Sequence, residues 1–376
     1  MAQGVKKTLL ECEKWQCVDL LPKVTLSSLS SKKRNSVANK RSWCIAITAL
    51  WLLIGAVSAQ SNPEANDASK RAKVLNVVTS LSSSDPMYLG LQRFKALVEA
   101  RSDGSLSVNV FVGSQLGNDD DILEQAMAGA AIAVLVDGGR LSVYTHELGI
   151  LGAPYLVSSI DELRKLVGSE LFSRWNGKLQ DSAHLRVLAF NWWQGARHLL
   201  TQQPITQPSD LSGVRLRTIS APVWIRTIDA MGATPTPLSW SEVYSALQQR
   251  VIDAAEAQLA AVWGARLYEV VSHVTKTGHI QLISGLVTSD DWFNSLTPSE
   301  QAILNQAAIE AGDYASQNVL AAEKDIELSL TDAGVTITTP DRQPFIDATE
   351  PVYNQLGYTQ LRNQVRDFLN GKGERE

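Results

Sequence analysis

Residues 74–79, Val-Leu-Asn-Val-Val-Thr, begin the stretch that decides the fold. This run predicts a strand, and Pro86–Arg101 then places apolar side chains at helical spacing. Ser105–Val112 alternates as a second strand does, Asp119–Met127 has a helical pattern, and Ala131–Val136 is a continuous apolar run typical of a buried strand. Strand–helix–strand–helix–strand predicts a parallel sheet with helices on both faces.

A second set of elements follows. We predict strands at Leu185–Asn191 and Val214–Thr218, a helix at Ala221–Met231, and a short strand near Thr234. No repeat or long linker separates the two sets, so we expect two lobes joined by short crossings, with a ligand cleft between them. The expected division gives residues 72–194 and 283–322 to lobe I and residues 195–282 and 323–376 to lobe II.

Three helix starts carry a hydroxyl residue three positions before a glutamate, which is the pattern of a capping box. They are Ser159 with Glu162, Ser239 with Glu242, and Thr297 with Glu300. After the third, the chain stays compatible with a helix as far as Gly334. A helix, or a kinked pair, of more than about thirty residues is too long for one small lobe, so we expect it to brace both lobes.

The first sixty residues are expected to be a targeting segment. Residues 32–41 are rich in Lys and Arg, Cys44–Val57 is almost entirely apolar, and Val57-Ser58-Ala59 has the small residues of a cleavage site. The apolar run is shorter than the roughly twenty residues that span a bilayer. We therefore predict export to the periplasm with cleavage near Ala59 and Gln60; an uncleaved membrane anchor is the alternative. Residues 60–71 are expected to be a flexible start of the mature chain, and whether residues 1–31 are translated stays open.

The composition of the mature chain excludes several classes of protein. Residues 1–59 carry nine of the 34 Lys and Arg and three of the 39 Asp and Glu, which leaves 25 basic and 36 acidic residues and a net charge of −11. An acidic chain without basic clusters is not expected to bind nucleic acid. All three cysteines, Cys12, Cys17 and Cys44, precede Ala59, which excludes disulfides and a cysteine nucleophile from the mature protein.

No motif of a common enzyme class is present. The chain has no Gly-x-Ser-x-Gly elbow and neither of the glycine-rich phosphate-binding patterns. The histidines lack the spacing of a zinc site, so we expect no metal and no cofactor. Asp119-Asp120-Asp121 lacks the spaced oxygens of a calcium loop, and we expect it to be a solvated helix N-terminus. The pattern therefore indicates a protein that is not an enzyme.

Two arginines on one predicted strand stand out. Strand alternation places Arg215 and Arg217 on one face, with Val214 and Leu216 on the other. A guanidinium stays charged and offers two parallel donors, which suits a carboxylate ligand. From the pattern alone, a surface ion pair is the alternative.

Short motifs in a fixed order extend over almost the whole mature chain. They are Gly113-Ser-Gln-Leu-Gly117, Gly152-Ala-Pro-Tyr-Leu156, Gly195-Ala-Arg197, Asp210-Leu-Ser-Gly-Val-Arg-Leu-Arg217, Glu242-Val-Tyr-Ser-Ala-Leu-Gln248 and Ile252-Asp-Ala-Ala-Glu256. In this order they resemble the dicarboxylate-type solute receptors of TRAP (tripartite ATP-independent periplasmic) transporters. The resemblance implies an α/β, two-lobe, periplasmic-binding-protein-like fold that captures an organic acid. It also implies two partners, a small and a large membrane subunit, and transport driven by an ion gradient.

The resemblance also implies roles for individual residues of the second lobe. Arg217 matches the arginine that usually forms the two-pronged salt bridge to the ligand carboxylate, and Arg197 matches a supporting arginine. Trp240 matches an aromatic residue that stacks on the ligand, and Glu256 matches an acidic site residue. Ala257 stands where an amide often holds the carboxylate, which puts a second carboxylate contact in doubt.

Positions of the first lobe follow from the same spacing. Ser80, Asp137 and Arg140 match positions that can face the cleft. Alternation turns only one of Trp192 and Trp193 inward; Trp193 is our candidate ligand contact, and a core role is the alternative.

Other candidates have structural alternatives too. Trp240 is alternatively a hydrophobic plug at a helix start, and Glu256 alternatively only pairs with Arg197 or Arg217. For His279 a structural hydrogen bond is the expected role.

The ligand stays open between two kinds of acid. Trp193 and Trp240 favour a flat, apolar or aromatic acid, whereas Asp137 and Ser80 suit the hydroxyl groups of a sugar acid. Alternatives for the whole protein are a receptor for an ATP-driven importer or a sensor kinase, and a periplasmic enzyme that acts on a carboxylate. We expect a monomer.

Overall fold

The computed structural model describes residues 72–372, which all belong to one compact unit of the chain, residues 62–376. The expected cleavage site and residues 1–71 lie outside the described residues. Among residues 72–372, no helix has the length and apolar character needed to cross a bilayer.

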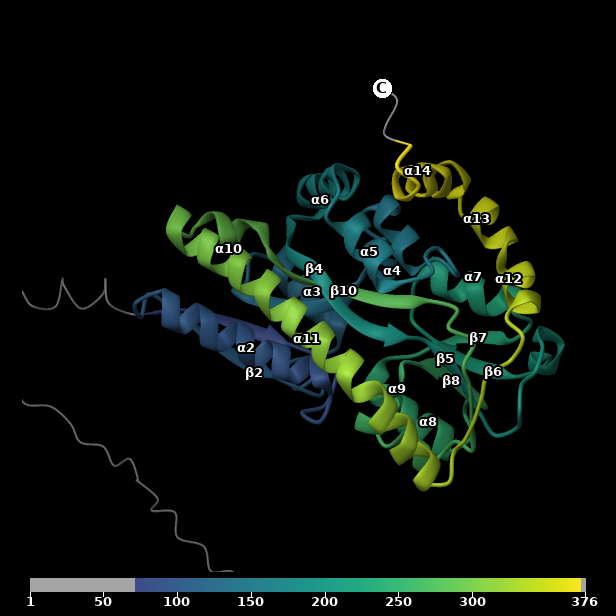
Figure 1. Ribbon diagram of the computed structural model, residues 1–376. Helices are drawn as coiled ribbons and strands as arrows, with labels where there is room; N and C mark the ends of the chain where they lie inside the picture. The colour runs from purple at the N-terminus through teal and green to yellow at the C-terminus, as the bar shows by residue number, and fades with distance from the viewer. Residues whose placement is uncertain (1–71, 373–376) are drawn as a thin grey trace, which may run out of the picture. The chain divides into compact units, whose positions relative to one another are not determined.

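The first sheet is mixed (Figure 1). In order across the sheet, its strands are β2 (Leu106–Phe111), β1 (Lys73–Val78), β3 (Ile132–Asp137), β10 (Gln281–Ser289) and β4 (Leu185–Ala196). Strands β1, β2 and β3 are parallel, as their pattern predicted, and all six residues of the apolar β3 are buried. The late strand β10 inserts antiparallel between β3 and β4, which no local pattern indicated.

The second sheet is built from shorter strands that lie later in the chain. In order, they are β11 (Thr336–Thr338), β9 (His273–Thr275), β5 (His198–Thr201), β8 (Ala254–Ala257), β6 (Arg215–Thr218) and β7 (Thr234–Pro237). One residue, Arg197, separates β4 of the first sheet from β5 of the second, and residues 276–280 separate β9 from β10. The two lobes are therefore joined by short adjacent crossings.

Helices cover both sheets. Those packed with the first sheet and its surroundings are α2 (Pro86–Arg101), α3 (Asp119–Met127), α4 (Gly138–Leu141), α5 (Ile160–Val167), α6 (Glu170–Ala183) and α10 (Asp290–Asn294). Those packed with the second sheet are α7 (Pro222–Ala230), α8 (Val243–Gln248), α9 (Leu259–Gly264) and α12 (Gln343–Thr349). The α/β class expected from the sequence is confirmed.

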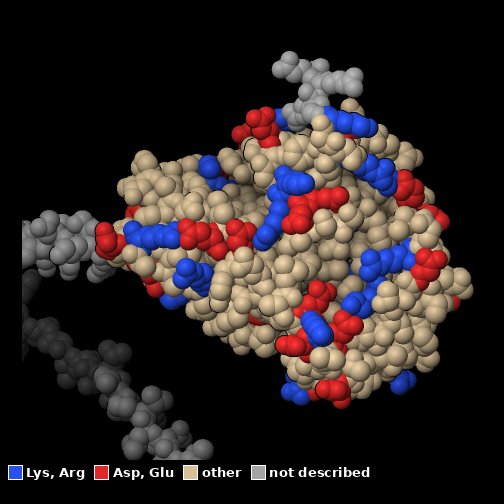
Figure 2. Space-filling model, viewed as in Figure 1, with Lys and Arg blue, Asp and Glu red and all other residues tan. Residues whose placement is uncertain are grey.

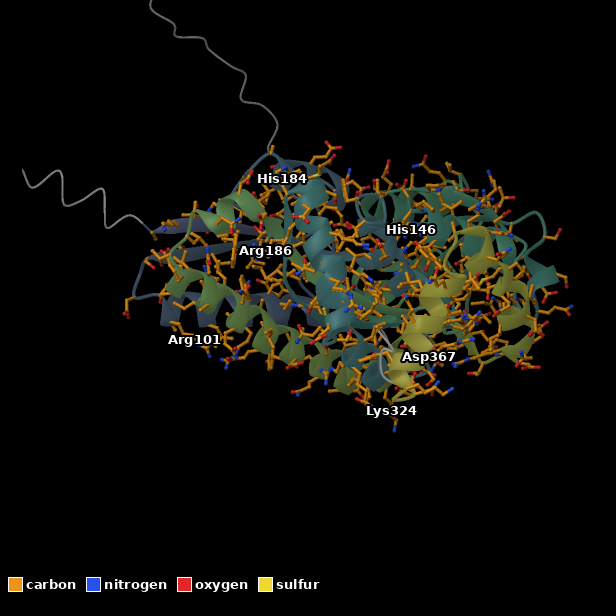
Figure 3. The ribbon with its side chains drawn as sticks, turned by 90° about the horizontal axis from the view of Figure 1, so that it is seen from above. Arg101, His146, His184, Arg186, Lys324 and Asp367 are labelled. Atoms are coloured by element: carbon orange, nitrogen blue, oxygen red, sulfur yellow. The ribbon has the colours of Figure 1, made fainter. Side chains whose placement is uncertain are left out.

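One helix contacts both lobes. Helix α11 (Pro298–Asp332) has 35 residues and runs from α2 and β4 to α9 and β11 (Figure 1). Its first half is fixed to α2 by the Arg101–Glu310 ion pair at 2.7 Å, and Lys324 lies on its second half (Figure 3). At Gly90 of α2 a Cβ atom would stand only 2.4 Å from the Cβ of Ala315, so glycine permits this close helix contact.

The three predicted capping boxes have different outcomes. At α11 the box is complete, because Thr297 accepts from the amide of Glu300 and Glu300 accepts from the amide of Thr297. Ser159 caps α5 on its own, because Glu162 accepts instead from the amide and hydroxyl of Ser158. The Ser239 prediction is wrong: a 3₁₀ turn, Trp240–Glu242, precedes α8, and the Ser239 side chain makes no capping bond.

Of the C-terminal helices, α14 (Thr359–Leu369) returns to α5 of the first lobe, and α13 (Pro351–Gln355) contacts both α14 and α7. Tyr353 and Tyr358 belong to the same core cluster as the first sheet, and the Tyr358 hydroxyl donates to the carbonyl of His146 at 3.1 Å. The Tyr353 hydroxyl donates to the carbonyl of Pro154 at 2.7 Å. The expected division placed residues 323–376 in lobe II, whereas this last segment packs with lobe I.

Candidate ligand-binding site

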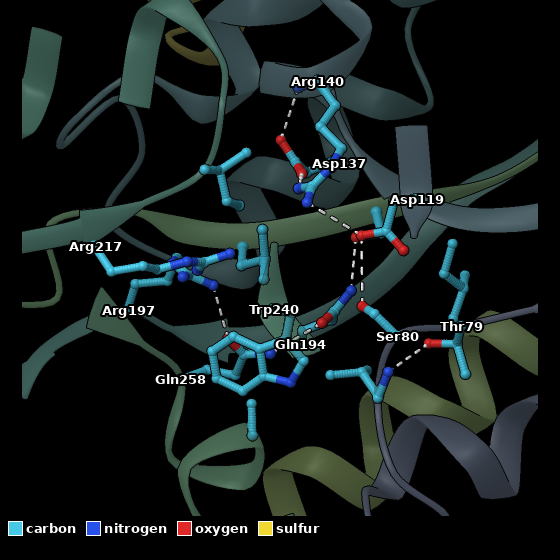
Figure 4. Close-up of a pocket in the computed structure, with 16 residues that line it drawn as sticks. Thr79, Ser80, Asp119, Asp137, Arg140, Gln194, Arg197, Arg217, Trp240 and Gln258 are labelled. Carbon is cyan, nitrogen blue, oxygen red and sulfur yellow. Dashed lines mark hydrogen bonds and ion pairs between the residues drawn. The ribbon is translucent and has the colours of Figure 1, made fainter. Parts of the chain in front are cut away.

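A polar pocket lies between the two sheets and encloses about 480 Å³, part of it open to solvent. Six of the predicted site residues line it: Ser80, Asp137, Arg140, Arg197, Arg217 and Trp240. Arg197 and Arg217 enter the pocket from one side, and Ser80 and Asp119 lie on the other (Figure 4).

Arg217 is buried in the pocket wall, and no carboxylate of residues 72–372 is paired with it. Arg217 comes directly after the buried Leu216 in β6 and is itself only 1% exposed. Its Nε donates to the carbonyl of Leu238 at 2.9 Å, and no acceptor among residues 72–372 is bonded to its two terminal nitrogens. Burial lowers the pKa of Arg217 to about 9, against the opposing effect of Glu256, so the group remains charged at neutral pH. Trp240 covers it, with the ring centroid 5.4 Å from Cζ.

Arg215 differs from Arg217 although it lies two positions away on the same strand. It is exposed and pairs with Asp253 at 2.8 Å. The surface ion pair considered from the sequence therefore applies to Arg215 and not to Arg217.

Arg197 is also buried, but each of its three guanidinium nitrogens donates a hydrogen bond within the protein. Its Nε donates to Oε2 of Glu256, its Nη1 to Oε1 of Gln258 at 2.9 Å, and its Nη2 to the carbonyl of Glu256 at 2.6 Å. The guanidinium also lies over the ring of Trp224, 4.8 Å from the centroid. Arg197 thus holds the second-lobe wall together.

Glu256 lies behind Arg197 and does not line the pocket. It is fully buried, accepts from the Thr218 hydroxyl at 3.3 Å, and stands 3.8 Å from Nε2 of His279. Burial alone raises its pKa, but Arg197 and the hydrogen bonds outweigh burial and hold the pKa at about 2. Of the two arginines that the sequence offered as its partner, the structure pairs it with Arg197.

Asp137 lines the pocket, yet its oxygens are used within the protein. Oδ1 accepts from the amide of Arg140 and from the indole nitrogen of Trp224, each at 3.1 Å, and Oδ2 accepts from Nη1 of Arg140 at 3.1 Å. Trp224 can approach because Gly139 has no side chain: a Cβ there would stand 1.9 Å from the indole nitrogen. Asp137 and Trp224 thereby bond the first lobe to the second.

Two tryptophans and an alanine belong to the core. Trp193 is 5% exposed, its amide donates to Oγ of Ser316 at 2.9 Å, and it is absent from the pocket lining. Trp192 is fully buried and packs against Gly90. Ala257 is fully buried in the second-lobe core. The prediction that Trp193 and Ala257 face the ligand therefore does not match their position, because both side chains point into packed interior.

Ten of the sixteen residues that line the pocket were not predicted, among them the polar Gln258, Gln194, Ser284 and Asp119. Gln258 donates to Gln194 at 3.0 Å, and Gln194 donates to Oγ of Ser284 at 2.7 Å, so a chain of amides crosses the base of the pocket. Gln258 lies just after the end of β8, at the N-cap of α9, and no pattern in the sequence set it apart. Asp119, expected to be solvated, is 8% exposed and pairs with Arg140 at 3.2 Å. The reason is tertiary: α4 brings Arg140 over the start of α3.

His279 is fully buried, and its Nδ1 lies 2.8 Å from the hydroxyl oxygen of Thr277. Burial lowers the pKa of His279, although Glu256 opposes this effect. Among residues 72–372, no group of three or more His, Cys, Asp or Glu side chains is placed to hold a metal ion.

Two α/β lobes that share short crossings and enclose a polar pocket define a two-lobed binding protein for a small solute. Residues 77–360 match the family described as bacterial extracellular solute-binding protein, family 7, and the chain belongs to this family. The resemblance to TRAP solute receptors and the two-lobe fold are thereby confirmed.

Known proteins similar to this chain include receptors for several acids. The 2,3-diketo-L-gulonate-binding periplasmic protein of Escherichia coli is 29% identical over 308 residues, 80% of this chain and 88% of that protein. The sialic acid-binding periplasmic protein of Vibrio cholerae is 27% identical over 259 residues, 69% of this chain and 80% of that protein.

Solved structures of TRAP periplasmic solute-binding proteins are similar over their full length. One from Actinobacillus succinogenes with bound L-galactonate is 30% identical, has a TM-score of 0.78, and covers 80% of this chain and 100% of its own. One from Escherichia fergusonii in an open form without ligand is 45% identical, has a TM-score of 0.70, and covers 79% of this chain and 100% of its own.

Proposed function

We propose that this chain captures a small organic acid in the pocket and holds its carboxylate by a two-pronged salt bridge to Arg217. The observation that carries the proposal is the bonding of Arg217: its buried, charged guanidinium lines the pocket, and its two terminal nitrogens have no acceptor within the described part of the chain. A buried charge without a partner is costly, and a planar carboxylate would satisfy both nitrogens at once. The bound L-galactonate of the Actinobacillus succinogenes protein is an acid of this kind.

The other wall residues have supporting roles in this proposal. Trp240 shields the Arg217 guanidinium from solvent, which strengthens a salt bridge beneath it. Arg197 fixes Gln258, whose amide lines the pocket beside the expected carboxylate. Glu256 acts through Arg197 and does not touch the ligand.

We further infer that the protein works as a monomer in the periplasm after cleavage near Ala59, and delivers its ligand to a small and a large membrane subunit. Membership of the family supports this over a receptor for an ATP-driven importer or a sensor kinase. We infer no catalysis, since the family consists of solute-binding proteins. Recovery of chemically altered acid after long incubation with the protein would contradict this.

A screen followed by calorimetry tests the carboxylate anchor. Protein purified from the periplasm is first screened by thermal shift against a library of organic acids that includes L-galactonate. A ligand at 100 times its Kd adds about 2.7 kcal/mol of stability, which moves the midpoint by several degrees. The affinity of the best acid is then measured for the wild type and for variants at Arg217 and Arg215.

We expect Arg217→Ala to weaken binding by about 2–5 kcal/mol or more, because the ligand carboxylate would be desolvated without a partner. Arg217→Lys keeps the charge but loses the planar fork, so it should also bind poorly while circular dichroism shows an intact fold. Arg215→Ala is the matched control on the same strand and should bind within about threefold of wild type. Wild-type affinity of Arg217→Lys, or a larger loss in Arg215→Ala, would show that Arg217 is not the anchor.

A further inference from the structure

The first-lobe wall of the pocket has more negative than positive charge. Arg140 is surrounded by three carboxylates: its Nη2 lies 3.2 Å from Asp119, its Nη1 3.1 Å from Asp137, and its Nε 3.6 Å from Asp120. One guanidinium therefore faces three carboxylates. The second-lobe wall has the opposite balance, because Arg197 is matched by Glu256 whereas Arg217 has no acidic partner.

Asp119 is the carboxylate of this wall that lines the pocket and still has an oxygen able to accept a hydrogen bond from a ligand. Its Oδ2 pairs with Arg140 and accepts from the Ser80 hydroxyl at 3.4 Å (Figure 4). No donor among residues 72–372 is bonded to its Oδ1. Burial raises the pKa of Asp119, Arg140 opposes this, and the neighbouring Asp137 and Asp120 add to the rise. A further negative charge at this place would face an already crowded group of carboxylates.

The polar groups on this wall suit hydroxyl groups. Ser80 and Arg140 offer donors and Asp119 offers an acceptor, all within one small area of the lining. A hydroxyl group both donates and accepts, so it can bond to such a mixed set. An ammonium group only donates and would be placed beside the Arg140 guanidinium, which repels it.

We propose that the pocket selects acids with a single carboxylate and a hydroxylated opposite end, and that Asp119 is the residue that rejects a second carboxylate. The inference rests on the proposed function, in which Arg217 holds the one carboxylate. The opposite end of the ligand then meets Ser80, Asp119 and Arg140. Of the two kinds of acid that the sequence left open, the lining favours the sugar acid, since Trp193 is buried in the core and only Trp240 remains as an aromatic contact.

Matched pairs of six-carbon acids test this selectivity. An aldonate and the aldarate of the same configuration share every hydroxyl group at carbons 2 to 5 and differ only at carbon 6, which is a primary alcohol in one and a carboxylate in the other. L-Galactonate with galactarate, and the gluco and manno pairs, are titrated by calorimetry at neutral pH. For the pairs that bind, we expect the wild type to prefer the aldonate by at least about 100-fold.

Asp119→Asn removes the charge and keeps the shape. We expect it to reduce this preference to less than about tenfold, chiefly through tighter binding of the aldarate, with Asp119→Ala as a second variant in case the first folds poorly. Asp161→Asn is the matched control, because Asp161 also lies in the first turn of a helix but is exposed and outside the pocket. Its aldonate-to-aldarate ratio should equal that of the wild type.

The outcomes distinguish failure of the Asp119 proposal from failure of the proposed Arg217 anchor. Equal wild-type affinity for both members of a pair, or an unchanged ratio in both Asp119 variants, overturns the role of Asp119. If no aldonate binds but another acid does so in an Arg217-dependent manner, the selectivity is wrong and the carboxylate anchor stands. If no acid binds with dependence on Arg217, the proposed function itself falls.

Discussion

The Arg197 and Arg217 regions of the second-lobe wall are buried to a similar degree but are bonded in opposite ways. Arg197 is 3% exposed and directs three nitrogens to Glu256 and Gln258, whereas Arg217 is 1% exposed and directs one nitrogen to a backbone carbonyl. The comparison teaches that burial and charge do not by themselves identify a binding residue. What distinguishes the two is which donors the protein leaves without an acceptor. Elsewhere in the described chain, acidic and basic side chains interleave over the face shown in Figure 2.

The largest expected effect is the loss of protein stability when Arg197 is replaced. Arg197→Ala leaves Glu256 as a fully buried carboxylate without its main partner, and breaking a buried pair in this way costs about 3–5 kcal/mol. Urea denaturation measures the loss. Calorimetry on the folded fraction should show a smaller loss of ligand affinity than in Arg217→Ala, and the reverse ranking would mean that Arg197 is the primary anchor.

Loss of the hydrogen bond from Trp224 to Asp137, which joins the two lobes beside Arg197, is expected to have the next largest effect on stability. Trp224→Phe keeps an aromatic ring but removes the donor to Asp137, and a hydrogen bond to a charged group contributes about 1.5–3 kcal/mol. Trp192→Phe is the control, because Trp192 is equally buried and its indole nitrogen has no partner within the described residues. Unfolding free energies that fall equally in both variants would indicate that ring size, and not the bond to Asp137, matters.

The Arg217 region should behave differently from the Arg197 region. Arg217→Met removes a buried charge that has no carboxylate partner among residues 72–372, so the free energy of unfolding should stay the same or rise by about 0.5–2 kcal/mol, a range usual for stabilising substitutions. Thermal denaturation without ligand measures this change. A large destabilisation would place Arg217 among the structural residues and would remove the contrast with Arg197.

The pH dependence of the Glu256 pair gives the smallest and most gradual effect. The pKa of Glu256 is lowered in the folded protein from 4.5 to about 2, so its stabilising contribution is complete above the unfolded value and is lost as the pH falls toward 2. We expect the stability gap between the wild type and Glu256→Gln to be widest at pH 7 and to shrink below about pH 5. A gap that widens on acidification would contradict the pairing with Arg197.

Local signals in the sequence predicted the elements that depend on local interactions. Helices α2 and α3 have the predicted bounds, and α11 begins at a complete capping box and ends before Gly334. The insertion of β10 between β3 and β4 was not predicted, because pairing between residues 85 to 155 positions apart leaves no local pattern.

The candidate site shows the same contrast between features that the sequence predicted and features that depend on distant contacts. The resemblance placed six of nine candidate residues on the pocket lining, yet it could not show that the oxygens of Asp137 are bonded to Trp224 and Arg140. Nor could it show that Asp119 is drawn out of solvent by Arg140. These depend on contacts between segments that are distant in the chain, and so does the bond from Arg197 that holds Gln258 at the pocket.

The single residue between β4 and β5 has a mechanical consequence. Arg197 occupies that crossing, and its amide donates to the carbonyl of Ile280 in the adjacent crossing at 2.9 Å. If one sheet rotates against the other about these joined crossings, each atom is displaced in proportion to its distance from them. Arg197 stands at the crossing and is then the residue displaced least, so its bonds to Glu256 and Gln258 can persist while the pocket walls move.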